Sequence, residues 1–170
     1  MMNLKRTLIS IFSLAFSLLL ISCTEKQDLA TITPSETSSM EHGLIIMESP
    51  FSFEETGSRI RTTLEERGLL IPADLNHQQN AAGVDMNLRP TRTIIFGNPN
   101  LGTPLMQCSQ SIAIDLPQKI LIWEDEPGNV QIAYNDPGYL KNRHGAQGCD
   151  QAFETVANAL ANLMESALSE

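Results

Sequence analysis

Residues 92–104 read RTIIFGNPNLGTP, and this segment is central to the predicted fold. The apolar run Ile94-Ile95-Phe96 predicts a buried strand, because β-branched and aromatic residues suit a packed, pleated surface. The sequence Gly97-Asn98-Pro99 predicts a turn that ends this strand, since proline lacks an N–H and glycine tolerates unusual backbone angles. A glycine-rich bend and a helical turn over 104–109 are expected to follow.

Strands and helices alternate on both sides of this segment. Short apolar runs predict strands over 43–48 and 69–76, and a hairpin over 119–135. Helices are predicted over 52–68, over 77–82 and from Asp150 to the C-terminus, with apolar residues at helical spacing. The pattern indicates an α/β (α+β) two-layer sandwich. A mixed β-sheet would have helices packed on one face, together with a C-terminal amphipathic helix.

Residues 1–22 are predicted to form a secretory signal peptide. Lys5 and Arg6 precede an apolar run over 8–21, which as a helix would span about 21 Å, short of a membrane core of about 30 Å. The run ends Leu20-Ile21-Ser22-Cys23, which resembles the bacterial lipobox. That resemblance implies cleavage before Cys23, acylation of Cys23 (palmitate among the chains) and a lipid anchor in the cell envelope. An ordinary secretory leader with an incidental cysteine is the alternative.

The predicted location in the cell and the predicted domain boundaries follow from this leader. The anchored chain is expected to face the periplasm or the cell exterior, at the outer membrane in a cell with two membranes, because Thr24 follows Cys23 where a retention Asp would sit. Residues 23–41 are rich in Ser, Thr and Glu and predict a flexible tether. Residues 42–170 predict a single globular domain. The formal net charge of −9 argues against nucleic acid as a partner.

Cys108 and Cys149 are the two cysteines that remain once Cys23 is assigned to lipid. Thiols in an oxidising compartment usually pair, which favours a disulfide between the helical turn after Met106 and the start of the C-terminal helix. A free, reactive pair of thiols is the alternative.

The order of several motifs resembles the bacterial and archaeal domain-of-unknown-function family numbered 302, over about residues 43–145. The motifs are 49–56 (SPFSFEET), Leu64 with Gly68, Asn76-His77, 90–99 (PTRTIIFGNP), 102–106 (GTPLM), 115–117 (DLP), 134–137 (YNDP) and His144. The resemblance implies a compact α/β fold, often a dimer, and no established activity. The family tends to place an Asp before the His where this chain has Asn76, which would make His77 a weaker base.

Several polar residues are candidates for a ligand site. His77 follows a strand and opens a helix, and its imidazole is a candidate base or ligand group, with His144 as a distant partner. A helix-capping or packing role for His77 is the alternative. Asn98, Thr103, Tyr134, Asn135 and His144 complete the candidate ligand-binding set. The spacing around Gly97 superficially matches a phosphate-binding loop, but Thr103 stands where the lysine is needed.

An acidic run, Glu124-Asp125-Glu126, falls at the tip of the predicted hairpin and favours solvated turn residues over a cation site. Glu124 is a candidate acid–base partner for Asp115 or an assistant to His77. The spacings typical of metal sites and cofactor fingerprints are absent from the sequence, so neither a metal nor a cofactor is predicted.

Three functional hypotheses remain. The first is a lipid-anchored module that binds a small ligand or an envelope protein in a cleft near His77, Asn98 and Tyr134. The second is a hydrolase-like or other enzyme with His77 as general base and Glu124 assisting. The third is a homodimeric structural protein, with the C-terminal helix or an exposed strand as its interface.

Overall fold

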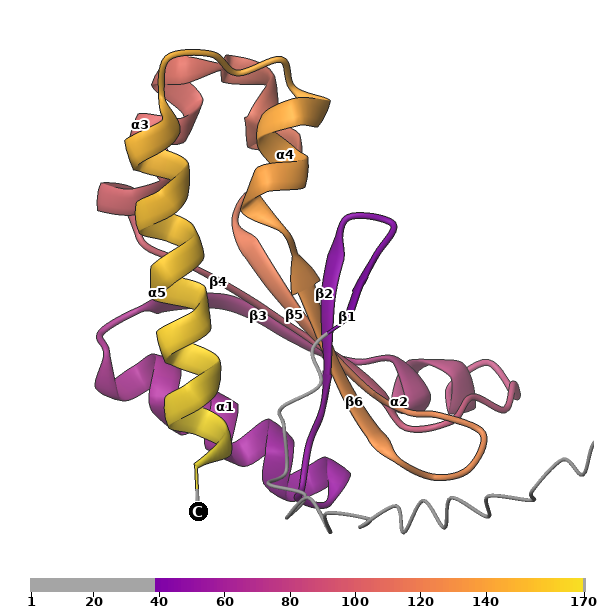
Figure 1. The fold of residues 1–170 in the computed structure, drawn as a ribbon. Helices are drawn as coiled ribbons and strands as arrows, with labels where there is room; N and C mark the ends of the chain where they lie inside the picture. Colours follow the sequence, from indigo (N-terminus) through magenta and orange to yellow (C-terminus); the bar gives the residue numbers. More distant parts are fainter. Residues whose placement is uncertain (1–38, 170) are drawn as a thin grey trace, which may run out of the picture. The chain divides into compact units, whose positions relative to one another are not determined.

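A computed structural model describes residues 39–169 and contains a six-stranded sheet in the order β1-β2-β6-β5-β4-β3 (Figure 1). The strands are β1 (Ser39–Glu41), β2 (Leu44–Glu48), β3 (Leu70–Asn76), β4 (Thr91–Gly97), β5 (Gln118–Glu124) and β6 (Val130–Asn135). The helices are α1 (Phe53–Glu66), α2 (His77–Ala82), α3 (Pro99–Cys108), the 3₁₀ helix η1 (Gln110–Ile114), α4 (Pro137–Arg143) and α5 (Asp150–Leu168).

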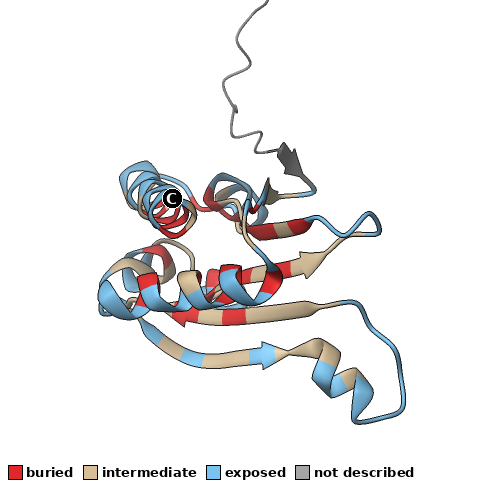
Figure 2. Ribbon diagram, turned by 90° about the horizontal axis from the view of Figure 1, so that it is seen from below, coloured by how far each residue is buried: buried red, intermediate tan, exposed pale blue. Residues whose placement is uncertain are grey.

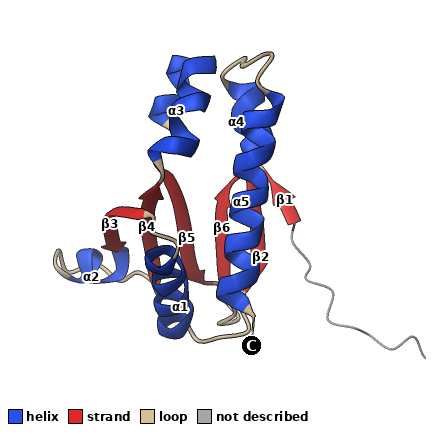
Figure 3. Cartoon of the chain, turned by 90° about the vertical axis from the view of Figure 1, so that its left-hand side faces the viewer, coloured by secondary structure: helices blue, strands red, loops and turns tan. Residues whose placement is uncertain are grey.

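The domain has two layers. Helices α1 and α5 lie over one face of the sheet, and α3 and α4 extend beyond one end of it (Figure 3). This arrangement confirms the predicted α+β sandwich with its C-terminal helix. The sheet is antiparallel rather than mixed, because each strand pairs antiparallel with its neighbours. Strands that follow each other through short connections, such as β5 and β6, pair in this way.

The core lies between the sheet and the helices (Figure 2). Ile94, Ile120 and Tyr134 lie side by side across β4, β5 and β6, and all three are buried. The apolar side of α5 completes this core, since Phe153 and Leu160 are buried as well. That side of α5 therefore packs within the domain and is not available as the dimer surface considered for the C-terminal helix.

The β1–β2 hairpin begins the sheet at Ser39, within the segment predicted to be a tether. His42 and Gly43 both have positive φ, at 51° and 81°, as a tight two-residue hairpin turn requires. The Tyr139 ring of α4 lies against Gly43, where an added Cβ would come within 2.4 Å of it. The predicted signal peptide and Cys23 lie outside the described residues.

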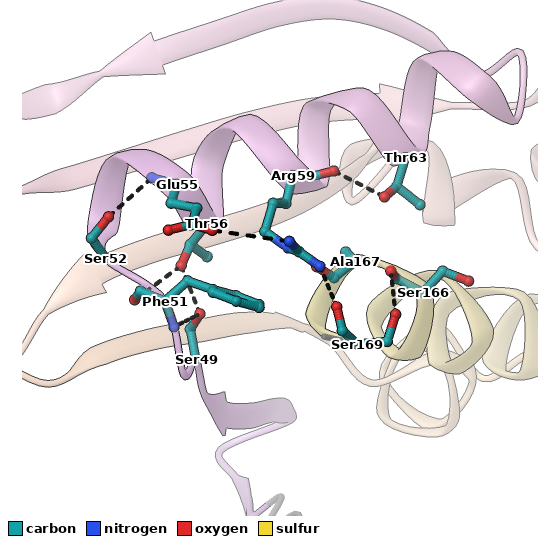
Figure 4. Close-up of polar contacts among 10 residues, drawn as sticks. All are labelled: Ser49, Phe51, Ser52, Glu55, Thr56, Arg59, Thr63, Ser166, Ala167 and Ser169. Atoms are coloured by element: carbon teal, nitrogen blue, oxygen red, sulfur yellow. Dashed lines mark hydrogen bonds and ion pairs between the residues drawn. The ribbon is translucent and has the colours of Figure 1, made fainter.

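The ends of α1 and α5 are joined by polar contacts (Figure 4). The Ser52 hydroxyl accepts a hydrogen bond from the Glu55 amide at 3.4 Å and caps α1. Further along α1, Arg59 Nε donates to the carbonyl of Ala167 at 2.8 Å, and the guanidinium lies 4.0 Å from the centre of the Phe51 ring. Arg59 thus satisfies a carbonyl at the end of α5 that the helix itself leaves unpaired.

Two helices differ from the prediction. Helix α3 begins at Pro99 rather than near Pro104, and α4 was not predicted. Both begin in the same way: the side chains of Asn98 and Asp136 cap the first turn, and a proline occupies the first helical position. Proline suits that position because its missing N–H would have no partner there. The Asn-Pro and Asp-Pro pairs are therefore helix starts here, not only turns.

Candidate functional site

A cavity of about 650 Å³ lies between the start of β3, the end of β4, α3 and α5. Its walls are mostly apolar, with contributions from Leu70, Phe96, Leu105, Val156 and Leu163. The size falls within the range of about 300–1,000 Å³ that is typical of small-molecule sites. This end of the sheet therefore contains a largely apolar cavity of the size of a small-molecule site.

The segment that dominates the sequence pattern builds one wall of this cavity. Strand β4 ends at Gly97, Asn98 caps α3, and the chain turns away from the sheet at this point. Gly102 of α3 lines the cavity, and an added Cβ there would approach Leu116 only to 3.8 Å. The strand-to-helix bend thus separates α3 from the sheet and leaves room beneath α5.

Gln118, at the start of β5, is the unusual residue of the cavity. Its side chain is 7% exposed and lies beside Phe96 on the covered face. Both its amide nitrogen and its amide oxygen lack a hydrogen-bond partner within the part of the chain that the structure describes. An unsatisfied buried polar group costs about 1–3 kcal/mol. Gln118 therefore contributes to the cavity lining, and its amide carries an unused donor and an unused acceptor that are themselves buried.

Arg67 is the one charged residue among the described residues that line the cavity. Its Nη2 atom donates to the carbonyl of Asn162 at 2.8 Å and to the Ser166 hydroxyl. These contacts hold the guanidinium against α5. Asn98, Thr103 and Gln118 are the other residues with polar side chains in the lining.

Sequence reasoning places two of its candidate ligand residues at this site and four elsewhere. Asn98 and Thr103 line the cavity. His77 follows Asn76, which pairs with Arg92 at the opposite end of β4 from Asn98. Six residues of strand separate those ends, or about 20 Å. The predicted cleft shared by His77, Asn98 and Tyr134 is therefore wrong.

Tyr134 and Asn135 are part of the sheet rather than of the cavity. Tyr134 is buried on the covered face, and burial, followed by the charge of Asp136, raises its pKa above the ordinary value of 10.0. Asn135 pairs with Leu44 of β2. Both residues serve the β2–β6 pairing in this structure.

His77 contacts a hydroxyl rather than a carboxylate. Its Nε2 lies 3.0 Å from Thr93 Oγ1, on the face of the sheet away from α1 and α5. Glu124 lies opposite the buried Val130, on the other face, so the predicted His77–Glu124 pair does not form. Asn76 caps α2 by accepting a hydrogen bond from the Gln79 amide. The Asn that departs from the family pattern thus has a structural role.

His144 lies at the end of α4, in contact with η1. Its Nε2 is 2.6 Å from Asp115 Oδ2, and its Nδ1 is 2.9 Å from Ser111 Oγ. The other Asp115 oxygen accepts a hydrogen bond from Arg143 Nη1 at 3.0 Å. Asp115 is therefore paired with His144 and Arg143, and not with Glu124 as the sequence suggested.

The most strongly paired charges form a cluster that sequence reasoning missed. Asp74 accepts hydrogen bonds from Arg92 Nε at 2.7 Å, Arg92 Nη2 at 2.6 Å and Arg61 Nη1 at 3.0 Å. The Arg92 hydrogen bond is the largest cause that lowers the pKa of Asp74, and Asp74 in turn raises the pKa of Arg92. Gly57 of α1 makes room, since an added Cβ would lie 2.3 Å from Arg92 Nη1.

Cys108 and Cys149 form a disulfide with a Cα–Cα distance of 6.3 Å. It joins the end of α3 to the residue before α5. Within residues 39–169, no group of three or more His, Cys, Asp or Glu side chains is placed to hold a metal ion. In the same residues, no helix has the length and apolar character needed to cross a membrane.

Residues 45–165 match the model of the family described as "Domain of unknown function DUF302". The chain belongs to the DUF302 family. A solved DUF302 protein from Bacillus stearothermophilus has the same fold, with a TM-score of 0.66 at 13% identity over 75% of this chain and 99% of that one.

Two curated relatives of the DUF302 chain are named as channels. The fluoride-specific ion channel FluC 1 of Brucella suis is 39% identical over 111 residues, which is 65% of this chain and 44% of that protein. FluC 2 of Brucella melitensis matches at the same identity, over 41% of its length. The DUF302 chain thus spans less than half of these relatives, and fluoride conduction is a property that their names give to them alone.

Proposed function

We propose that the DUF302 domain of this protein binds a small, largely apolar molecule that carries one polar end group. The cavity at the end of β4 supports this proposal through its size and its apolar walls. The observation that carries the proposal is the buried, unpaired amide of Gln118. A buried donor and acceptor are stabilised when a ligand supplies the missing partners.

The chemistry of Gln118 defines the end group. The side-chain nitrogen donates and the oxygen accepts, and both are buried in the ligand-free structure. Once the side chain turns toward the cavity, a carboxamide or a protonated carboxylic acid can engage both atoms at once. A hydrocarbon of the same length fills the cavity but leaves the amide unpaired. The ligand is therefore expected to combine an apolar body with a group that both donates and accepts.

A lipid anchor at Cys23 is the proposed location of this module. The lipobox-like end of the leader supports it, and the Cys108–Cys149 disulfide fits an oxidising compartment outside the cytoplasm. Cells grown with labelled palmitate should label the wild-type protein and leave the Cys23→Ser variant unlabelled and released from the membrane fraction. Label on Cys23→Ser would contradict anchoring through this residue.

Ligand binding is tested by native mass spectrometry of the exported protein with decanamide, decanoic acid and decane at equal concentrations. Two hydrogen bonds to Gln118 should favour decanamide over decane by about tenfold. The variant Gln118→Met should lose that preference while it still binds decane. Equal binding of decanamide and decane by the wild type would remove the assigned role of Gln118.

A cavity-filling variant distinguishes binding in the cavity from binding on the protein surface. Ala159 lines the cavity, whereas Ala161, on the same helix, is exposed. Ala159→Trp should abolish binding of all three probes, and Ala161→Trp should bind them as the wild type does. Unchanged binding by Ala159→Trp would contradict the cavity as the site.

The uncovered face of the sheet is where we propose that a second copy would bind if the predicted homodimer forms. Leu121 and Trp123 of β5 alternate with buried Ile120 and Ile122, so they point away from α1 and α5. Light scattering measures the molar mass of the wild type and of Leu121→Lys. A wild-type dimer that uses this face should become a monomer in the variant.

A further inference from the structure

Ser111, His144 and Asp115 form a continuous chain of side-chain hydrogen bonds outside the cavity. Ser111 Oγ lies 2.9 Å from His144 Nδ1, and His144 Nε2 lies 2.6 Å from Asp115 Oδ2. The His144 and Asp115 side chains are 7% and 12% exposed, whereas Ser111 is exposed to solvent. An accessible hydroxyl is thus backed by a shielded imidazole and a shielded carboxylate.

Two segments far apart in the sequence hold these groups together. Ser111 and Asp115 lie on η1 and directly after it, and His144 follows α4. The Ser109 hydroxyl donates to the carbonyl of His144 at 3.1 Å. The disulfide between Cys108 and Cys149 links the flanking segments close by. The backbone of both segments is therefore fixed near the three side chains.

A serine nucleophile requires one particular set of proton positions in this chain, because either ring nitrogen of His144 can carry the proton. With the Nε2–H of His144 donating to Asp115, Nδ1 of the neutral ring is an acceptor for the Ser111 hydroxyl proton. Arg143 holds the other oxygen of Asp115, which fixes the orientation of the carboxylate. A nucleophile, a base and a group that orients the base thus lie within hydrogen-bond distance in the order Ser–His–Asp, with Nδ1 rather than Nε2 of the ring facing the serine.

The geometry points to Ser111 as a nucleophile for acyl transfer, with His144 as its general base and Asp115 as the residue that positions the ring. In the first step Ser111 Oγ bonds to the carbonyl carbon of a carboxylic ester, and the hydroxyl proton moves to His144 Nδ1. The carbon–oxygen bond of the leaving alcohol breaks, and that oxygen takes the proton from Nδ1. Water then attacks the acyl-serine by the same route, which releases the carboxylic acid and restores Ser111.

The surroundings of Ser111 indicate the class of ester. Ser111 stands at the surface, and Ile114, three residues along the same 3₁₀ turn, is 75% exposed. Residues three apart lie on one side of a 3₁₀ helix, so an apolar side chain flanks the hydroxyl. Small esters with an apolar acyl group and a good leaving group fit this open site, because their cleavage depends least on a separate oxyanion-stabilising group.

A fluorophosphonate probe tests the assignment directly, since it forms a Ser–phosphorus bond and releases fluoride. Peptide mass analysis of the labelled wild-type protein should find the phosphonyl group on Ser111. The variants Ser111→Ala and His144→Ala should each label at least about 100-fold more slowly, the contribution typical of a nucleophile–base pair. Ser58→Ala removes an exposed serine of α1 and should label as the wild type does.

Hydrolysis of 4-nitrophenyl butyrate provides the matching activity. Ser111→Ala should abolish it, and Asp115→Asn should slow it, with partial recovery in Asp115→Glu. Label on other serines, or hydrolysis that is unchanged in Ser111→Ala, would show that the three residues only hold α4 against η1. The mass analysis uses the wild-type protein, so a variant that fails to fold does not remove the test. The result is also independent of the cavity, since Ser111 does not line it.

Discussion

Two polar groups on the covered face of the sheet, Asp74 and Gln118, have opposite environments. Asp74 receives three hydrogen bonds from Arg92 and Arg61, whereas Gln118 receives none from the described residues. Native proteins pair nearly all their buried polar groups, so an unpaired one needs an explanation. The Asp74 end of the sheet is thus fully paired, whereas the Gln118 end keeps a buried amide without a partner among the described residues, as the proposed ligand site would require.

The largest effect is expected from the disulfide between α3 and the start of α5, the two helices that line the cavity together with Gln118. The bonded cysteines are 41 residues apart, and a closed loop of that length contributes about 4 kcal/mol in the chain-entropy model. The double variant Cys108→Ser/Cys149→Ser should lose about that much free energy of unfolding in urea, together with most of its decanamide binding. A loss below about 1 kcal/mol would show that the cavity end is held by packing alone.

Breaking the paired end should have the next largest effect. Asp74→Asn leaves Arg92 without its carboxylate partner, whereas Arg61, exposed on α1, keeps Glu65 at 3.0 Å. Charged hydrogen bonds such as those of Arg92 contribute about 2–3 kcal/mol. Urea unfolding should show this loss with little change in decanamide binding. Glu154→Gln, on the exposed side of α5, is the matched control and should change stability by less than about 0.5 kcal/mol.

Substitution of Gln118 should increase the stability of the protein, whereas the two preceding substitutions decrease it. Gln118→Met keeps the side-chain length and removes both unsatisfied atoms, so the ligand-free protein should gain about 1 kcal/mol of stability. Gln151→Met, on an exposed position of α5, should change stability much less. Destabilisation by Gln118→Met would mean that the amide already has partners in the free protein, and the contrast with Asp74 would disappear.

The pH dependence of stability should distinguish the Asp74 end of the sheet from the Gln118 end, by a smaller effect. The pKa of Asp74 is lowered from 3.8 in the folded protein, chiefly by the Arg92 hydrogen bond. Its stabilising contribution is therefore complete above about pH 4 and is lost as the pH falls through the lowered value. The stability difference between wild type and Asp74→Asn should shrink below pH 4. The difference between wild type and Gln118→Met should not, because neither side chain titrates.

Local signals in the sequence predict most elements of this fold. The alternation of apolar residues gives β4, β5 and β6, and the spacing of Phe53, Ile60 and Leu64 gives α1. The missed helix α4 has a local signal as well, the Asp136-Pro137 start. The direction in which the strands pair has no such local signal, because pairings such as that of β2 with β6 join residues far apart in the chain.

The cavity was harder to predict because it is made by several elements at once. Asn98 and Thr103, which were predicted as ligand residues, line the cavity because they lie beside the strand-to-helix bend. Gln118 was missed, although it has the same parity as Ile120 and Ile122 and so falls on the buried face. A polar residue in register with a buried stripe is the signal that would have revealed it. The absence of its partners, in contrast, is visible only in three dimensions.

The β1–β2 hairpin determines how the domain responds to a mechanical load from its N-terminal side. Tension applied at Ser39 peels β1 from β2 one residue pair at a time, from Ser39–Ile46 toward the turn at His42 and Gly43. Peeling breaks few hydrogen bonds at once, so β1 yields at low force while the other five strands keep their pairing. This short edge strand is thus expected to detach first under a pull and to re-form afterwards, while the core stays folded.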